Sequence, residues 1–359
     1  MLGNMEIQYT QRLNKIEAVL HSWLPGTPDP SWLEKVFLLP GENINRSLVK
    51  ALTLPGWDLL NRGGKRWRPL LMVLIAEALA GEKGAAAAIP LTPLVELAHN
   101  ASLIHDDIED SSDERRGKPA VHLIYGNDAA INSGAFLYFL PLACIAGTDF
   151  SDEAKLRIHE TWGTYMARLH LGQAMDIAWH NENHFFPEIR EYETMCRLKT
   201  GCLARLAAAL GLYCAEYSLG TGRIDDNLAE DLKNGAEKLG LGFQILDDVK
   251  NLTTGNPGKK RGDDIVEGKK SLPILLYLHR RPEKQEFAAR CFHAARSFGP
   301  EAPELEELIE ALQMEGILEE ALHKGKTLIN ESKEIFTGMA SPDPKGRELL
   351  GGLLDFVSE

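Results

Sequence analysis

Two acidic clusters lie inside strongly apolar segments that carry the pattern of helices. The first reads HDDIED at residues 105–110, and the second reads LDDVKN at residues 246–251. Carboxylates are seldom placed among apolar side chains without cations, because burying an uncompensated charge is costly. The chain therefore has to fold so that both clusters meet positive charge, either from its own side chains or from bound ions.

Within each cluster the polar residues recur at helical spacing. Asp106 and Asp110 are four residues apart, which puts them on one face of a helix about 6 Å apart along its axis. Asp247 and Asn251 have the same spacing. Two such oxygen-bearing faces, looking at each other across a cavity, would suit several Mg²⁺ ions shared with a bound phosphate group.

Composition argues against several classes of protein. The 359 residues are enough for one large domain or two ordinary ones, and 44% of them are hydrophobic, as in globular proteins. A formal net charge of −13 argues against nucleic acid as a general partner. Residues 1–23 carry charges throughout and lack the apolar core of a signal peptide. The most apolar runs, Leu70–Ala80 and Ala135–Ala146, have about a dozen residues where a bilayer span needs about 20, so we predict no membrane span.

The cysteines are odd in number and lie mostly in apolar helical segments. Because no two of them form a CxxC pair, we expect buried free thiols in a reducing compartment and predict a cytoplasmic protein. The cysteines are Cys144, Cys196, Cys202, Cys214 and Cys291.

Helical periodicity dominates the chain, and few segments have the pattern of strands. Apolar residues recur at i, i+3, i+4 and i+7 between Leu305 and Leu312, and at similar spacing between Leu13 and Leu20. The strongly acidic outer face of residues 301–320 is typical of a solvated helix surface. These patterns predict an all-α fold.

Segments rich in Pro or Gly predict the breaks between helices, but none of them divides the core. We therefore predict an N-terminal helical extension at residues 1–60 and a single all-α core domain at residues 61–359. The predicted breaks lie at residues 24–32, 81–84, 117–119 and 253–262.

Positive charge is concentrated next to the acidic clusters. Lys65 and Arg68 begin an apolar helix one turn apart, and Arg115 and Arg116 follow the first cluster. Each pair by itself is more often surface charge, and salt bridges from the two arginines to the first cluster would require no ligand. The alternation of basic and acidic groups instead favours a polyphosphate bound partly through metal ions and partly directly. The other basic residues in this pattern are Lys199, Lys260 and Lys269.

Other signals are weaker. In LGQAMD at residues 171–176, Gly172 allows a close helix approach and Asp176 can orient a neighbouring cation or water. The histidines lack zinc-ligand spacing, which makes a zinc site improbable. The sequence contains no P-loop, no GxSxG elbow and no Cys–His nucleophile signature. These patterns disfavour a zinc enzyme, a P-loop nucleotide-binding protein and an enzyme with a side-chain nucleophile.

Taken together, the motifs resemble those of the trans-isoprenyl diphosphate synthases, or polyprenyl synthetases. The resemblance covers about residues 63–278 in the family's order, and its details look most like the eukaryotic-type geranylgeranyl diphosphate synthases. The motifs are GGKRWRP (63–69), HNASLIHDDIEDSSDERRG (99–117), LGQAMD (171–176), KTG (199–201), FQILDD (243–248) and GDDIVEGKKSLP (262–273).

The resemblance implies the isoprenoid synthase fold, in which antiparallel helices surround a central cavity, and a homodimer. It implies a Mg²⁺-dependent prenyltransferase that condenses isopentenyl diphosphate with an allylic diphosphate, which is dimethylallyl, geranyl or farnesyl diphosphate. Three Mg²⁺ would bind in each active site, two on Asp106 and Asp110 and a third on Asp247. Asp107 and Asp248 would support them.

The resemblance also implies which side chains hold each substrate. The allylic diphosphate would contact Arg115, Lys199 and Lys260, with Lys269 close by. Thr200 and Gln244 would line the reaction centre. The diphosphate of isopentenyl diphosphate would be held by Lys65, Arg68, His99 and Arg116.

Product length depends on side-chain size along the tunnel. Ala101 and Ser102 precede Asp106 by about one helical turn and are too small to block a growing chain. The resemblance implies a deeper floor at Tyr138, Phe139 and His170, although Tyr138 and Phe139 would also suit ordinary core packing. We expect a C20 product, geranylgeranyl diphosphate, and leave a C15 or longer product as alternatives.

Two further functions fit part of the pattern. A non-catalytic subunit that regulates a partner would tolerate degenerate aspartates, whereas all five aspartates of the two motifs are present. A terpene cyclase would ionise an allylic diphosphate but would not need the second set of basic residues. Both alternatives therefore explain less of the sequence than a prenyl diphosphate synthase does.

Overall fold

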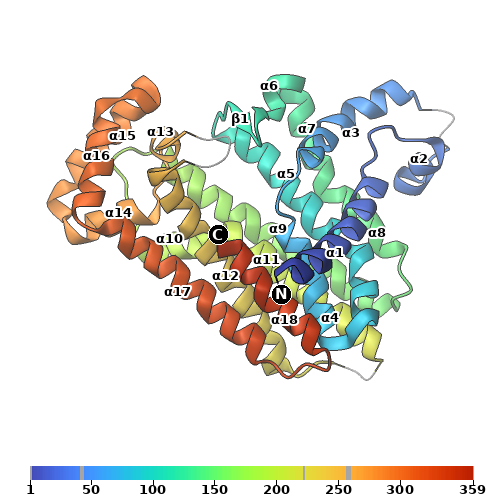
Figure 1. Ribbon diagram of the computed structural model, residues 1–359. Helices are drawn as coiled ribbons and strands as arrows, with labels where there is room; N and C mark the ends of the chain where they lie inside the picture. Colours follow the sequence, from blue (N-terminus) through green and yellow to red (C-terminus); the bar gives the residue numbers. More distant parts are fainter. Residues whose placement is uncertain (1, 41–43, 221–222, 256–259, 359) are drawn as a thin grey trace. The chain divides into compact units, whose positions relative to one another are not determined.

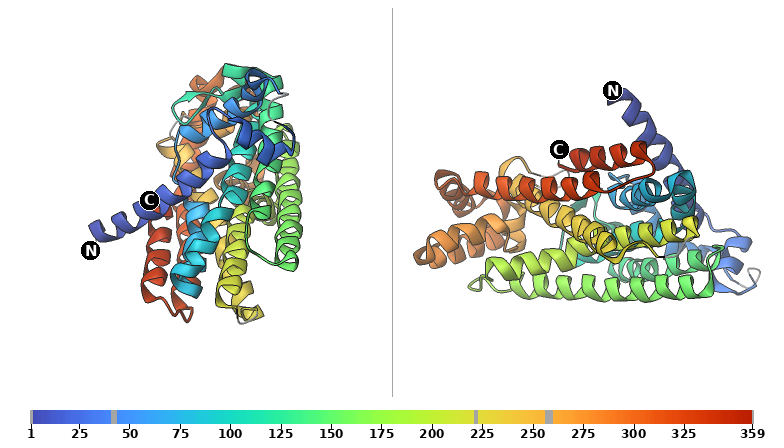
Figure 2. Two further views of the ribbon diagram at one scale, coloured as in Figure 1. Left: turned by 90° about the vertical axis from the view of Figure 1, so that its right-hand side faces the viewer. Right: turned by 90° about the horizontal axis from the view of Figure 1, so that it is seen from below.

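The computed structural model describes residues 2–40, 44–220, 223–255 and 260–358, and these residues are mostly helical (Figure 1). Figure 2 shows the same helical rods from two other sides; within the described ranges a single pair of very short strands interrupts the pattern. The prediction of an all-α fold is therefore confirmed. The chain forms two compact units, residues 1–163, 206–233 and 336–353 in the first, and residues 164–205, 234–335 and 354–359 in the second.

The first unit contains the N-terminal helices, the first acidic cluster and the strand pair. Its elements are α1 (Leu2–Trp23), α2 (Pro30–Phe37), α3 (Arg46–Asn61), α4 (Trp67–Ala88), η2 (Ile89–Leu91), α5 (Pro93–Glu109), β1 (Glu114–Arg115), β2 (Lys118–Pro119), α6 (Val121–Tyr125), α7 (Asn127–Phe139), η3 (Leu140–Leu142) and α8 (Ala143–Ala146).

The second unit contains the KTG motif and most of the C-terminal half of the chain. Its elements are α10 (Ile189–Cys196), η4 (Arg197–Gly201), α13 (Asp263–Glu267), α14 (Leu272–Arg280), η5 (Pro282–Lys284), α15 (Gln285–Phe298), η6 (Gly299–Glu301) and α16 (Pro303–Met314). Five helices contribute residues to both units: α9 (Asp152–His180), α11 (Cys202–Leu219), α12 (Asp226–Thr253), α17 (Ile317–Gly338) and α18 (Pro344–Ser358).

Two of the predicted breaks show local chemistry at work. The break predicted at residues 24–32 ends at Asp29, because Asp29 caps α2 by accepting a hydrogen bond from the Trp32 N–H at 2.8 Å. Pro30 then occupies the first turn, where its missing N–H costs nothing. The break predicted from residue 81 is a kink inside α4, where Gly81 has φ 64° and ψ −154°.

The strand pair places two of the predicted basic residues in a tight turn. Glu114 pairs with Pro119, and Arg115 pairs with Lys118. The two residues between the strands, Arg116 and Gly117, both have positive φ, as two-residue hairpin turns of this kind require. A sequence with an all-α pattern gave no warning of this hairpin, because two-residue strands are too short to show alternation.

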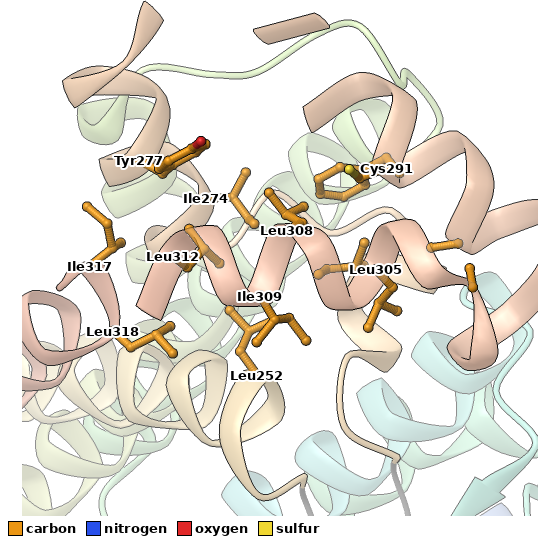
Figure 3. Close-up of a cluster of buried hydrophobic side chains, with 14 residues drawn as sticks. Leu252, Ile274, Tyr277, Cys291, Leu305, Leu308, Ile309, Leu312, Ile317 and Leu318 are labelled. Carbon is orange, nitrogen blue, oxygen red and sulfur yellow. The ribbon is translucent and has the colours of Figure 1, made fainter. Parts of the chain in front are cut away.

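The core of the second unit confirms the periodicity of the acidic helix α16. Its apolar residues Leu305, Leu308, Ile309 and Leu312 are at most 2% exposed and belong to one hydrophobic cluster. Figure 3 shows these side chains among Leu252 of α12, Ile274 of α14 and Cys291 of α15. Glu306, Glu307 and Glu310 on the other side of α16 are exposed, as expected for a solvated surface.

All five cysteines are buried free thiols, which confirms the prediction from their spacing. Burial raises the pKa of the Cys144 and Cys214 thiols well above their ordinary value, so these groups stay protonated. They therefore act as small apolar core residues.

Two helical stretches pass a membrane-span test by length and composition. Asn127–Ala146 has 20 residues and Ile189–Leu219 has 31, and 50% and 78% of their most apolar windows are buried inside the protein. Buried core helices of soluble proteins pass the same test, so one or two such stretches are weak evidence for a membrane span.

Candidate active site

The first acidic cluster forms the last turn of α5. The Asp110 N–H donates to the Asp106 carbonyl at 2.8 Å, so the helical turn that carries both residues is intact, as their spacing predicts. Asp107 lies between them and its side chain is fully buried, whereas the Asp106 side chain is 15% exposed. The middle aspartate is therefore turned into the protein while its neighbour stays accessible.

Arg115 holds the buried aspartate. Its Nε and Nη2 donate to Asp107 Oδ1 at 2.8 and 2.5 Å, and its Nη2 lies 3.7 Å from Asp106 Oδ2. The alternative of a salt bridge to the first cluster is thus partly right for Arg115. Arg116 behaves differently, because its Nη1 donates to the backbone carbonyls of Leu59, at 3.2 Å, and Gly63.

Four cationic or imidazole groups predicted to bind one diphosphate come from separate elements of the first unit. Arg68 Nη1 lies 3.5 Å from His99 Nε2, with the Arg68 guanidinium 4.4 Å from the Trp67 ring centroid. Lys65 is exposed on the turn before α4. Burial, together with the charges of Arg68 and Arg116, lowers the pKa of His99 well below its ordinary value. His99 is therefore neutral near pH 7, with one ring nitrogen that accepts a hydrogen bond and one that donates.

The positively charged side chains in this region repel one another. Burial lowers the pKa of Arg116 to about 10, and the neighbouring Arg66 and Arg115 act in the same direction. Gly63 and Gly64 have φ of 82° and 134°, which lets the turn pass against the Arg116 side chain. A bound anion would relieve the repulsion in this region.

The second acidic cluster lies near the end of α12 and repeats the arrangement of a buried and a more accessible aspartate. Asp248 is 4% exposed, and it accepts from Tyr192 Oη at 2.6 Å and from the Leu272 N–H at 3.1 Å. Burial raises the pKa of Asp248 to about 7, and the nearby Asp264 carboxylate adds to the shift. Asp247 is only partly buried.

Asp248 also orients the two groups predicted to line the reaction centre. Gln244 Nε2 donates to Asp248 Oδ1 at 2.9 Å, and Thr200 Oγ1 donates to Gln244 Oε1 at 2.8 Å. When Asp248 is ionised it can only accept, so the Gln244 amide group then points its NH₂ toward Asp248 and its oxygen toward Thr200. The chain of bonds runs from Tyr192 and Asp248 to the KTG motif.

The KTG motif lies in a wide π turn, η4, which is pressed against α9. A side chain at Gly172 would place its Cβ 2.4 Å from the Lys199 backbone nitrogen, so this position needs glycine, as predicted. Lys199 Nζ forms an ion pair with Asp176 Oδ2 at 2.6 Å. The prediction that Asp176 can orient a neighbouring cation is confirmed, and the cation is Lys199.

The Asn251 side chain holds the segment that follows α12. Asn251 is fully buried, and its Oδ1 accepts from the Asp264 N–H at 3.3 Å. The Asn251 side chain is therefore bonded to the segment that begins α13. Lys269 Nζ pairs with Glu267 Oε2 at 2.9 Å, and Lys260 is exposed. Residues 256–259, which include the neighbouring Lys259, lie outside the described residues.

The predicted chain-length residues fall into two groups. Ala101 and Tyr138 are buried and Ser102 is partly buried, and the Tyr138 ring lies 5.7 Å from the His105 ring. Gly134 of α7 allows this approach of α7 and α5, because a Cβ there would lie 2.6 Å from His105 Nε2. By contrast, the Phe139 side chain is 68% exposed, and His170 is exposed as well.

Sequence reasoning missed three residues that hold this machinery. Tyr192 supports Asp248, while Glu96 binds Arg66 through an ion pair of 2.8 Å inside the first unit. Arg66 lies within GGKRWRP, so its place between two predicted ligands was a usable signal. For Tyr192 and Glu96, the spacing along the chain gave no signal of their role.

Across the ranges that the structure describes, no group of three or more His, Cys, Asp or Glu side chains could hold a metal ion by itself. The oxygens of Asp106, Asp110 and Asp247 are nevertheless of the type that Mg²⁺ prefers. Mg²⁺ usually binds through one or two carboxylates, with water and substrate phosphates as the other ligands. The donor set therefore fits Mg²⁺ that arrives with a phosphorylated substrate.

Comparison with known proteins agrees with this chemistry. The pattern of the polyprenyl synthetase family matches residues 49–311. Geranylfarnesyl diphosphate synthase of Aeropyrum pernix is 32% identical over 309 residues, which are 84% of this chain and 92% of that protein.

Solved structures show the same fold over the whole chain. The geranylgeranyl pyrophosphate synthetase of Pyrococcus horikoshii matches with a TM-score of 0.82 and 26% identity, covering 100% of this chain and 99% of that one. A polyprenyl synthase from Caulobacter crescentus, complexed with calcium and isoprenyl diphosphate, matches with a TM-score of 0.78 and 26% identity, covering 100% and 97%.

The helical fold, the two acidic helix ends and these matches define a prenyltransferase of isoprenoid biosynthesis. The chain belongs to the polyprenyl synthetase family and is a trans-prenyl diphosphate synthase.

Proposed function

We propose that this enzyme makes geranylgeranyl diphosphate, a C20 product, by adding isopentenyl diphosphate to dimethylallyl, geranyl or farnesyl diphosphate. The observation that carries the proposal is the grouping, within the first unit, of Arg68, His99 and Arg116, in addition to Arg115 beside Asp106 and Asp107. Two anion-binding sets are needed by an enzyme that holds two diphosphates, and a terpene cyclase would need one.

The allylic diphosphate would be held by three aspartates of the two acidic clusters and by basic groups. Asp106, Asp110 and Asp247 would hold three Mg²⁺, and Mg²⁺ supplies Lewis-acid stabilisation of the departing diphosphate charge. Asp107 would support Asp106 from a buried position through Arg115, and Asp248 would support the site by holding Gln244. The basic groups that would contact this diphosphate are Arg115, Lys199, Lys260 and Lys269.

Isopentenyl diphosphate would be held by the second basic set. Arg68 and Arg116 offer forked donors to phosphate oxygens, and Lys65 adds a point charge. The neutral His99 adds a hydrogen bond without adding to the repulsion between the arginines.

The reaction then needs no side-chain nucleophile. The allylic C–O bond breaks and its electrons leave with the diphosphate, whose charge is stabilised by preorganised cations. The Thr200 and Gln244 dipoles, which Asp248 holds in place, would face the allyl cation that remains. The isopentenyl double bond supplies the electrons of the new C–C bond, and the released diphosphate takes the proton.

The purified protein tests this directly. It is incubated with Mg²⁺, labelled isopentenyl diphosphate and each of the three allylic diphosphates, and the products are dephosphorylated and sized. We expect a C20 product with every primer. Accumulation of C15 or of chains beyond C20 would refute the proposed length, whereas no product would favour the non-catalytic subunit.

Replacing Tyr138 by alanine is expected to lengthen the main product by at least one C5 unit. Tyr138 is buried against His105 of α5, which directly precedes Asp106. The Tyr138 ring therefore occupies space beside α5. Product size after reaction with farnesyl diphosphate is the measurement. Phe139→Ala serves as the matched control, because Phe139 is an adjacent aromatic that is mostly exposed in the single chain. A longer product from Phe139→Ala alone would place the floor at Phe139 instead.

We also propose that the enzyme is a cytoplasmic homodimer with a core domain at residues 61–359. Buried free thiols support a reducing compartment. Light scattering on the purified protein tests the assembly, and a mass of one chain would rule out the dimer.

A further inference from the structure

Arg66 is held in an unusual way for a residue between two substrate-binding groups. It directly follows Lys65 and lies two residues before Arg68, yet its side chain is only 3% exposed. Its backbone is left-handed, with φ 47° and ψ 25°, a conformation that costs a non-glycine residue about 1 kcal/mol or more. Such a conformation persists when surrounding contacts over-determine it.

Three contacts from different parts of the first unit supply that restraint. Arg66 Nε donates to Glu17 Oε1 of α1 at 2.7 Å, and Arg66 Nη1 donates to Glu96 Oε1 of α5 at 2.8 Å. Its Nη2 donates to the Leu60 carbonyl at the end of α3 at 2.5 Å. The guanidinium therefore joins helices α1, α3 and α5 at the turn that begins α4.

The two carboxylates are not equivalent. Glu96 is 2% exposed and also accepts from Asn100 Nδ2 at 3.0 Å, so it is fixed within α5. Glu17 is 34% exposed at the side chain, and its other oxygen lies 3.6 Å from His21 on the same helix. Glu17 is thus a partly exposed contact between the N-terminal helix and the basic turn.

Charge in this region makes the Glu17 contact important for binding. Lys65, Arg68 and Arg116 lie around the same turn, and Arg116 also grips the Gly63 carbonyl. With Glu17 and Glu96 both present, the Arg66 charge is balanced and its side chain is drawn into the protein. Without Glu17, Arg66 keeps one carboxylate, and the strained turn loses one of its three restraints.

We infer that Glu17 is a positioning residue for isopentenyl diphosphate binding, which acts through Arg66 on the turn that carries Lys65 and Arg68. The inference rests on the proposed function of that basic set. It gives the N-terminal helix α1 a part in substrate binding, although α1 lies before residue 49, where the match to the family begins.

The test compares E17Q with R12Q in the full-length protein. Arg12 also joins α1 to α4, through an ion pair with Glu77 in which Nε lies 2.7 Å from Oε2, but it does not touch the basic turn. Both variants therefore weaken the anchoring of α1, and only E17Q removes a carboxylate charge from Arg66. Steady-state kinetics are measured for each substrate, well below the lowest melting temperature of the three proteins.

We expect E17Q to raise the KM for isopentenyl diphosphate about tenfold, with kcat and the KM for farnesyl diphosphate within about twofold of the unmodified protein. R12Q should leave all three constants within about twofold. An unchanged KM for isopentenyl diphosphate in E17Q, or an equal rise in R12Q, would overturn the inference. If the unmodified protein made no product from isopentenyl diphosphate, the proposed function would fail instead.

Discussion

Replacing Asp247 by alanine is expected to lower kcat by about 10³-fold while the helical circular dichroism stays unchanged. Asp247 is partly exposed near the end of α12, so its loss removes a predicted metal ligand and little packing. The neighbouring Asp248 keeps its bonds to Tyr192 and Gln244 in this variant. The loss of several kcal/mol of charge stabilisation at the leaving diphosphate accounts for the size of the effect.

The matched control is Asp231→Ala, which removes an exposed carboxylate from the same helix far from the cluster along the chain. It should leave kcat within about twofold. Asp106→Ala is expected to behave like Asp247→Ala, and both should need more Mg²⁺ for half-maximal rate. A kcat within about tenfold of normal in either variant would discredit the metal assignment.

Replacing Lys199 by methionine is the second change with a large expected effect, a fall in kcat of about 10²-fold. Lys199 is 20% exposed and its ammonium is aimed by Asp176 at 2.6 Å, so it is a preorganised positive charge. Such a charge stabilises the leaving diphosphate without having to reorganise during the reaction. Rates at saturating substrate measure the loss.

This variant also removes the Lys199 ion pair from the 7% exposed Asp176 carboxylate, which should lower the melting temperature. The double variant Lys199→Met with Asp176→Asn removes that penalty. We expect the double variant to recover the melting temperature but not kcat. If kcat returned together with stability, Lys199 would be a structural residue only.

The local features of the fold could be read from the sequence because helical spacing is a property of neighbouring residues. The apolar face of α16 and the shared turn of Asp106 and Asp110 follow from a 3.6-residue period. The close approach at Gly172 was also predictable, since only glycine removes a Cβ. The hairpin at Arg115 and Arg116 was not, because its strands are too short for a pattern.

The sequence predicted which types of residue form the site, but not which group each side chain bonds to. Arg115 and Arg116 are adjacent and identical in the sequence, yet Arg115 holds a carboxylate and Arg116 holds backbone carbonyls. Asn251 has the spacing of a site residue, yet it is buried against Asp264. These outcomes depend on positive backbone φ at Arg116 and on the path of the chain after α12, neither of which spacing encodes.

The sequence by itself determined that this protein is helical and that carboxylates and basic groups gather at a few helix ends. Those properties arise from residues within one or two turns of each other. Only the tertiary structure decided that Asp107 and Asp248 are the buried aspartates, and that Glu17 reaches Arg66 from the N-terminal helix. Burial and long-range pairing depend on which helices pack together, and this packing depends on residues that are far apart in the sequence.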